Sequence, residues 1–192
     1  MASPSPRGRP RDPDIDAKVL EVARQLLAEE GFTATTVQEI SRRSGIHAPA
    51  IYRRWPCRLA LIEHAAVGTL REVDVTPTGE LRHDLRRFLE AYERTFSSPV
   101  ARAAMPWLLD AYQRGAAPQP GQWEPLSMRP LFEAVLRAAE PGLVDPDLAT
   151  DDVFDVLLGA MLVRALVPAT PGRDRDIETT IDLLLRLVRP DR

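Results

Sequence analysis

Cysteine and long apolar runs are nearly absent from this chain of 192 residues, and each absence excludes a class of protein. Cys57 is the only cysteine, so neither an intrachain disulfide nor a cysteine-based metal cluster can form, and a reducing cytoplasm is the expected compartment. No apolar run reaches the roughly 20 residues that a membrane-spanning helix needs. The start, MASPSPRGRPRD, contains arginines but no apolar core, unlike a secretory signal. We therefore expect a cytoplasmic protein without a membrane partner.

The residue patterns of common enzymes and metal sites are also missing. The three histidines, His47, His64 and His83, are scattered, and no HExxH spacing occurs. The sequence has no GxGxxG, GxxxxGKS, GxxxxGKT or GxSxG motif. Acidic residues cluster at 145–147 and 151–152, where a helix start explains them, since carboxylates favour the positive end of a helix dipole. The sequence predicts no enzyme, cofactor or metal site.

What the chain does contain is the composition and periodicity of a helical globular protein. Hydrophobic residues make up 44% of the chain and charged residues 28%. Apolar positions recur at helical rather than strand spacing, so we predict an all-α fold of about nine helices. We expect a disordered basic arm over residues 1–14, an N-terminal helix-turn-helix domain over 15–57 and a helical domain over 58–192.

Caps and helix breakers predict the helix boundaries. The first helix should begin at Asp14 or Asp16 and end at Gly31. In the helical domain, Asp145-Pro146 should begin the second-last helix, because an acidic cap followed by proline is a good helix start. The expected helices there span residues 58–73, 79–98, 99–114, 128–139, 145–167 and 174–188.

Positive charge is concentrated in the N-terminal domain. The net charge of −3 argues against nucleic-acid binding when the chain is taken as a whole. Residues 36–58, however, contain five arginines and a single acid, Glu39. Because local charge decides phosphate binding, this segment remains a candidate for binding nucleic acid.

Residues 35–58, TTVQEISRRSGIHAPAIYRRWPCR, predict two short helices separated by a glycine turn. A threonine can cap the first helix, and Val37 and Ile40 fall on its buried face. Gly45 can adopt the left-handed conformation of a tight helix exit, and Pro49 suits the first turn of the second helix. This is the arrangement of a helix-turn-helix, whose second helix enters the major groove of DNA.

Several residue types recur here at fixed spacing. They are AEEGF at 28–32, TTVQEI at 35–40, SGI at 44–46, the pair Ile51-Tyr52, an aromatic at Trp55 and a basic residue at Arg58. Over roughly residues 15–65 the chain resembles the N-terminal domain of TetR/AcrR-family transcriptional repressors. The resemblance implies a homodimer that binds a palindromic operator in double-stranded DNA and leaves it when a small-molecule effector binds.

The outward face of the second helix and its flanks are candidates for DNA contact. His47-Ala48-Pro49 stands where the resembled pattern usually has a serine, a cation and often a glycine, so a phosphate-binding cation is missing at Ala48. Arg7-Gly8-Arg9 resembles an arginine arm for a narrow minor groove; the alternative is a solubilising tail. The predicted DNA-binding residues are Arg7, Arg9, Thr35, Thr36, Arg43, His47, Ala48, Pro49, Ala50, Tyr52, Arg53, Arg54 and Arg58.

The last two predicted helices are apolar on more faces than one small domain needs. We expect them to pair with their copies in a second chain, as the resemblance also implies; the alternative is that they form only intrachain core. The predicted dimer-interface residues are Phe154, Leu157, Leu158, Met161, Leu162, Ala165, Leu184 and Leu187.

The middle helices should hold the effector pocket that the resemblance implies, with plain core as the alternative. Their composition indicates an apolar or aromatic small molecule. The predicted pocket residues are Phe88, Tyr92, Phe96, Met105, Trp107, Trp123 and Phe132. Two other functions stay open: a helical protein–protein adaptor without DNA binding, and a ligand-independent or activating member of the resembled family.

Overall fold

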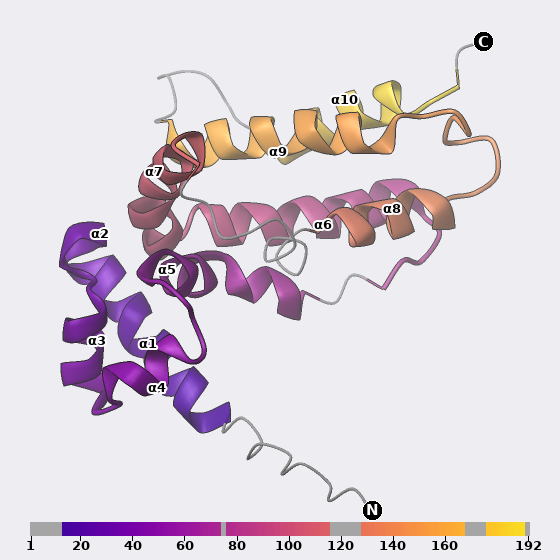
Figure 1. Cartoon of the computed structure of the whole chain (residues 1–192). Coiled ribbons are helices and arrows are strands. Elements are labelled where there is room, and N and C mark those ends of the chain that lie inside the picture. The colour runs from indigo at the N-terminus through magenta and orange to yellow at the C-terminus, as the bar shows by residue number, and fades with distance from the viewer. Residues whose placement is uncertain (1–12, 74–75, 116–127, 168–175, 191–192) are drawn as a thin grey trace, which may run out of the picture.

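The computed structural model describes residues 13–73, 76–115, 128–167 and 176–190. In these ranges it contains ten α-helices, one 3-10 helix and no strand, which confirms the predicted all-α fold. Figure 1 shows the first four helices gathered at one end of the molecule and the later helices stacked in layers beside them. None of the helices in these ranges has the length and apolar character needed to cross a membrane.

A small N-terminal bundle contains the predicted helix-turn-helix. It consists of α1 (Pro13–Glu29), α2 (Gly31–Ala34), α3 (Val37–Ser44) and α4 (Ala48–Tyr52). Its fully buried side chains include Leu26 and Leu27 of α1, Ile40 of α3 and Ile51 of α4. The single turn α2 is absent from the sequence prediction. Gly31 does end α1, with φ of +79°, but the chain then makes one more helical turn.

The fifth helix joins this bundle to the rest of the protein and is shorter than predicted. α5 (Arg58–Val67) changes into the 3-10 helix η1 (Gly68–Glu72) instead of running on to residue 73. Gly68 lies against the imidazole of His64, where an added Cβ would be 2.4 Å from Cδ2 of that ring. A side chain at position 68 would therefore require the His64 ring to move, and the chain tightens at this point.

The C-terminal body is organised around one long amphipathic helix. It consists of α6 (Leu81–Phe96), α7 (Pro99–Gln113), α8 (Arg129–Ala138), α9 (Thr150–Leu166) and α10 (Ile177–Leu187). The predicted apolar stripe of α6 is buried against α8, α9 and α10. In Figure 1, α6 and α8 lie between α5 on one side and the α9–α10 pair on the other. The buried Asp84 fixes the turn before α6, since its carboxylate accepts the N–H groups of Thr78 and Gly79 at 2.8 and 3.1 Å.

The predicted start of the second-last helix is wrong. Asp145 and Pro146 lie in turns, and α9 begins only at Thr150. The N–H of Asp145 donates to the carbonyl of Val188 at 2.8 Å, just beyond α10. This long-range hydrogen bond ties the segment to the C-terminal end of α10. The acid–proline pair is therefore used in a turn instead of a helix cap.

Candidate nucleic-acid interface

The first helix of the helix-turn-helix, α3, is defined by caps at both ends. Thr36 precedes it in an extended conformation, and its Oγ1 accepts the N–H of Glu39 at 3.1 Å. Gly45 follows it with φ of +70°, and its N–H donates to the carbonyl of Ser41 at 3.0 Å. A side chain at position 45 would strain this left-handed conformation, so glycine sets the direction of the chain toward α4.

The second helix, α4, is anchored from its inner side. Ile51 and Trp55 are buried, and the indole Nε1 of Trp55 donates to Nδ1 of His64 on α5 at 3.0 Å. His47 precedes α4 in an extended conformation without a side-chain cap, and Pro49 occupies the first turn. These contacts hold α4 on the bundle and leave its other side free for contact.

We call the outer side of this helix the α4 face. It comprises the exposed residues His47, Pro49, Tyr52 and Arg53 and the half-buried Ala48 and Ala50. Tyr52 exposes 50% of its surface. Arg53 takes part in none of the ion pairs found among the described residues. A phenol and a cation suit phosphates, and small apolar side chains allow close approach to base edges.

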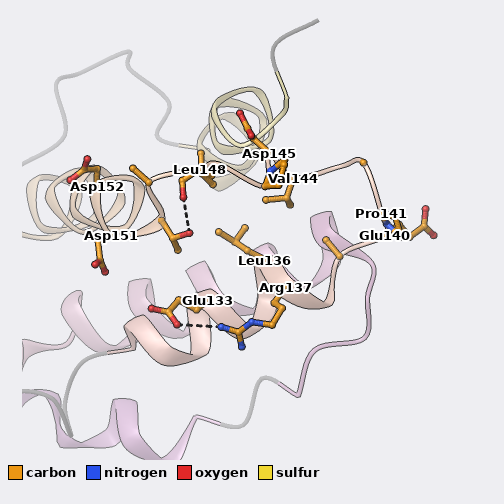
Figure 2. Close-up of a pocket in the computed structure, with 15 residues that line it drawn as sticks. Glu133, Leu136, Arg137, Glu140, Pro141, Val144, Asp145, Leu148, Asp151 and Asp152 are labelled. Atoms are coloured by element: carbon orange, nitrogen blue, oxygen red, sulfur yellow. Dashed lines mark hydrogen bonds and ion pairs between the residues drawn. The ribbon is translucent and has the colours of Figure 1, made fainter.

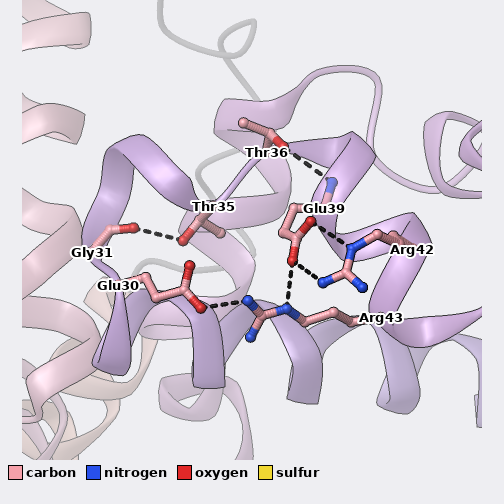
Figure 3. A network of polar contacts seen from close by, with 7 residues as sticks. All are labelled: Glu30, Gly31, Thr35, Thr36, Glu39, Arg42 and Arg43. Atoms are coloured by element: carbon pink, nitrogen blue, oxygen red, sulfur yellow. Dashed lines mark hydrogen bonds and ion pairs between the residues drawn. The ribbon is translucent and has the colours of Figure 1, made fainter.

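The arginines of α3 are neutralised by acids of the same bundle (Figure 3). Nε of Arg42 and Nε of Arg43 donate to Glu39 at 2.9 and 2.6 Å, and Arg43 also pairs with Glu30 at the end of α1. Hydrogen bonds from Arg42, and then from Arg43, lower the pKa of Glu39 to about 2. A phosphate that binds either arginine must therefore compete with Glu39.

Two of the predicted DNA contacts, Thr35 and Arg58, have side chains that are engaged within the protein. The Thr35 side chain is completely buried, and its hydroxyl donates to the carbonyl of Gly31 at 2.8 Å. The guanidinium of Arg58 donates to the carbonyls of Thr35, at 2.7 Å, and Phe32, and it lies 4.3 Å from the centre of the Phe32 ring. Burial lowers the pKa of Arg58. Arg58 therefore joins α5 to the α2–α3 connection.

Arg54 is also engaged within the bundle. Its side chain is only 10% exposed and forms an ion pair with Asp16 of α1, and it donates to the carbonyl of Ala50 at 3.3 Å. The predicted DNA-binding residues did not include two exposed residues of α3. These are Arg42, whose side chain is 68% exposed, and Gln38 in the first turn. Their position outside the buried stripe of α3 was the available signal.

The residues predicted to line an effector pocket mostly pack on one another. The ring of Phe88 lies 5.2 Å from that of Tyr92 and 5.5 Å from that of Phe132, and Phe154 of α9 lies 5.7 Å from Phe132. All four are buried, as are Phe96 and Met105. In this structure the aromatic cluster forms core between α6, α8 and α9.

Trp107 does not belong to that cluster. It is 49% exposed, and its ring stacks on Phe32 of α2. The remaining predicted pocket residue, Trp123, and the two arm residues, Arg7 and Arg9, lie outside the described residues.

A separate cavity of about 690 Å³ lies between α8, the turns that follow it and the start of α9 (Figure 2). None of the predicted pocket residues lines it. Its charged side chains are Glu133, Arg137, Glu140, Asp145, Asp151 and Asp152. This cavity is acidic and lies far along the chain from the helix-turn-helix.

Most of the predicted dimer residues lie within the core of the single chain. Phe154, Leu157, Met161, Ala165 and Leu184 are buried, Leu158 and Leu162 are half-buried, and only Leu187 is exposed. α9 is apolar nearly all round, so periodicity could not tell which of its sides faces inward. The exposed set, which we call the α9–α10 apolar face, consists of Val156, Val163 and Val167 with Leu183 and Leu187.

Comparison with known proteins agrees with this architecture. Residues 19–65 match the model of the tetR family of bacterial regulatory proteins, and residues 75–184 match that of the tetracyclin repressor-like C-terminal domain. A DNA-binding transcriptional repressor TetR of Mycobacteroides abscessus is 30% identical over 91% of this chain and 94% of its own. An HTH-type transcriptional regulator of Mycobacterium tuberculosis is 27% identical over 91% and 89%.

A solved structure shows the same arrangement of helices. The TetR family transcription regulator SCO0332 superposes with a TM-score of 0.67 at 26% identity, covering 92% of this chain and all of that one. The two family models together cover both the helix-turn-helix and most of the C-terminal body. This chain belongs to the TetR family of DNA-binding transcriptional regulators.

Proposed function

We propose that this regulator is a homodimeric repressor that binds a palindromic operator and is released by a small-molecule effector. The observation that supports it most is the α4 face, where Tyr52 and Arg53 stand outward on a helix anchored by Ile51 and Trp55. Repression is favoured over activation because the relative from Mycobacteroides abscessus is named a repressor. Family membership also places the chain among regulators rather than enzymes.

The α9–α10 apolar face supports the homodimer. Val156 and Leu183 are 63% and 60% exposed, which places large apolar surface in water on the last two helices. Gly159 and Ala160, also exposed, let another helix approach closely at the middle of α9. A second copy of the same face would bury this surface and form a four-helix interface.

Dimerisation would place two α4 faces on one operator. Binding of two half-sites by linked domains raises affinity through effective concentration. An effector weakens DNA binding only as far as it binds more tightly to the form of the dimer in which the two α4 faces are wrongly spaced for the operator. α5 is the connecting element, since it packs on α1 of the bundle and on α7 of the body.

The test is a gel shift with DNA fragments from the region upstream of the gene and with a random-sequence pool, at two salt concentrations. Tyr52→Ala and Arg53→Ala should abolish specific binding. Arg137→Ala, at an exposed position on α8, is the matched control and should bind as the wild type does. Failure to select any sequence at low salt would contradict the DNA-binding part and favour a protein–protein adaptor.

A further inference from the structure

A second cavity lies where the N-terminal bundle meets the C-terminal body. It has a volume of about 350 Å³ and is lined from α1, α5, η1, α6 and α7; we call it the junction groove. Small side chains leave the space open, among them Ala65, Ala66 and Ala91. The volume lies at the lower end of the range for small-molecule sites.

The charged side chains that line the junction groove are all positive. Two of its ten lining residues are arginines, Arg24 and Arg94, and none of the ten is acidic. Nε of Arg24 donates to the carbonyl of Ala65 at 3.2 Å, which fixes its guanidinium at the wall. The Arg94 side chain is 70% exposed, and its ion pair with Glu90 is long, at 3.9 Å. Because solvent screens an exposed pair of this length, Glu90 hardly restrains the guanidinium of Arg94. Both cations can therefore reach an anion in the groove.

We propose that the junction groove binds a small organic anion, a carboxylate or sulfonate on an apolar body. The apolar body would lie on the alanines and on Val73 and Val100, and the anionic group would accept hydrogen bonds from Arg24 and Arg94. A guanidinium binds oxyanions such as carboxylates with paired N–H donors, so an oxyanion is the head group that two arginines favour. The same two charges disfavour a cationic ligand.

The position of the groove gives such a ligand a regulatory consequence. Arg24 belongs to α1, Ala65 and Ala66 to α5, and Arg94 to α6, so one ligand touches both parts of the molecule. A ligand held between them favours one relative placement of bundle and body, and thus one spacing of the α4 faces. This consequence rests on the proposed function, whereas binding of the anion does not.

The experiment is calorimetric titration of the full-length protein with three probes that share one body: 4-phenylbutyrate, 4-phenylbutan-1-ol and 4-phenylbutylamine. The acid should bind at least about tenfold more tightly than the alcohol, and the amine more weakly still. Arg24→Gln should remove most of this preference, about tenfold, and Arg94→Gln about threefold, while both variants bind the alcohol as the wild type does. Arg24→Lys should retain part of the preference. Arg137→Gln, at the acidic cavity, should change nothing.

Equal binding of acid, alcohol and amine would overturn the proposal, as would no heat from the acid at millimolar concentration. Retention of the full acid preference in the Arg24→Gln, Arg94→Gln double variant would overturn it as well. Circular dichroism of each variant checks that it is folded, and the exposed Arg94 allows the test even if Arg24→Gln unfolds.

Adding 4-phenylbutyrate to complexes of the protein with pool-selected DNA separates the two proposals. If the anion binds through the two arginines but does not release the DNA, the proposed anion site is supported, and release of DNA by an effector at this site is contradicted. If the protein binds the selected DNA but not the anion, the DNA-binding function is supported and the proposed anion site in the junction groove is contradicted.

Discussion

The ring of Phe32 on α2 stacks on the ring of Trp107 on α7, with centroids 5.1 Å apart and planes inclined by 6°. Arg58 of α5 lies over the same phenylalanine ring. α2 of the bundle, the connecting helix α5 and α7 of the body therefore meet at Phe32. This contact joins the helix-turn-helix to the rest of the chain at the edge of the hydrophobic core, against which Phe32 also packs.

Trp107→Ala should destabilise the protein although the side chain is half exposed. Loss of the stacked ring and its contact area is expected to cost about 1.5 kcal/mol, or about 3–6 °C in the midpoint of thermal unfolding. Trp107→Phe should retain most of this stability because a ring still faces Phe32. Leu143→Ala, at another half-exposed apolar position, is the control. Equal losses for Trp107→Ala and Leu143→Ala would contradict a specific role for the stack.

Arg53 and Arg58 should respond oppositely to the same substitution. Arg58→Gln removes donors from two backbone carbonyls and is expected to lower the free energy of unfolding by about 2–3 kcal/mol. Arg53→Gln should leave unfolding unchanged, since its side chain is exposed and outside the ion pairs of the described residues.

DNA binding, unlike unfolding, should depend on Arg53. Arg53→Gln should reduce the slope of log affinity against log salt by about one per protomer, as expected for a lost phosphate contact. Denaturant titration and DNA binding at several salt concentrations measure the two effects. Loss of stability in Arg53→Gln, or an unchanged salt slope, would show that the α4 face is assigned wrongly.

Glu39 should titrate far below its ordinary pKa of 4.5. Its pKa in the folded protein is lowered to about 2, first by hydrogen bonding from Arg42 and then from Arg43. Because the folded value is below the unfolded one, the stabilisation is fully present above pH 4.5 and is lost as the pH falls from 4.5 toward 2. Carboxyl chemical shifts of Glu39 measure the titration directly.

Substitution and salt test the cause of this lowered pKa. Arg42→Gln should raise the titration midpoint, and high salt should raise it too, because the pair is exposed and screened. Arg114→Gln, which removes an exposed pair on α7, should leave it in place. A wild-type midpoint at 4.5 would mean that the Glu39–Arg42 pair is not formed in solution.

Leu183→Glu should convert a dimer into monomers without unfolding the chain. Leu183 is 60% exposed on the α9–α10 apolar face, so a carboxylate there is tolerated in a monomer but is buried unpaired in a dimer. Met161→Ala, in the intrachain core, should instead destabilise the fold by about 2–5 kcal/mol. Sedimentation at several concentrations and thermal unfolding distinguish these outcomes. A wild-type protein that is monomeric at micromolar concentration would contradict the interface.

Local chemistry in the sequence determined the helix-turn-helix. Thr36 caps α3, Gly45 ends it in the left-handed conformation, and Ile40 and Ile51 face inward, all as the residue spacing predicts. These features depend on residues a few positions apart, and their preferences for cap, turn and buried stripe act within one or two helical turns. The exposure of Tyr52 and Arg53 follows from the same spacing.

Tertiary structure alone decided which cations remain available to DNA and which apolar faces remain open. Arg54 is engaged by Asp16, 38 residues earlier, and Arg58 by carbonyls 23 and 26 residues earlier, so sequence spacing gave no sign of either partner. Asp145 does not cap a helix; its N–H donates to Val188 at the end of α10, and its carboxylate accepts the N–H of Asp147 in a turn. α9 is apolar on nearly every side, and only packing against α6, α7 and α8 decided that Met161 faces inward and Val163 outward. Packing of the whole chain sets which residues distant in sequence become partners, because local sequence preferences do not specify such partners. It also sets which side of an apolar helix faces inward, because the sides are equally apolar.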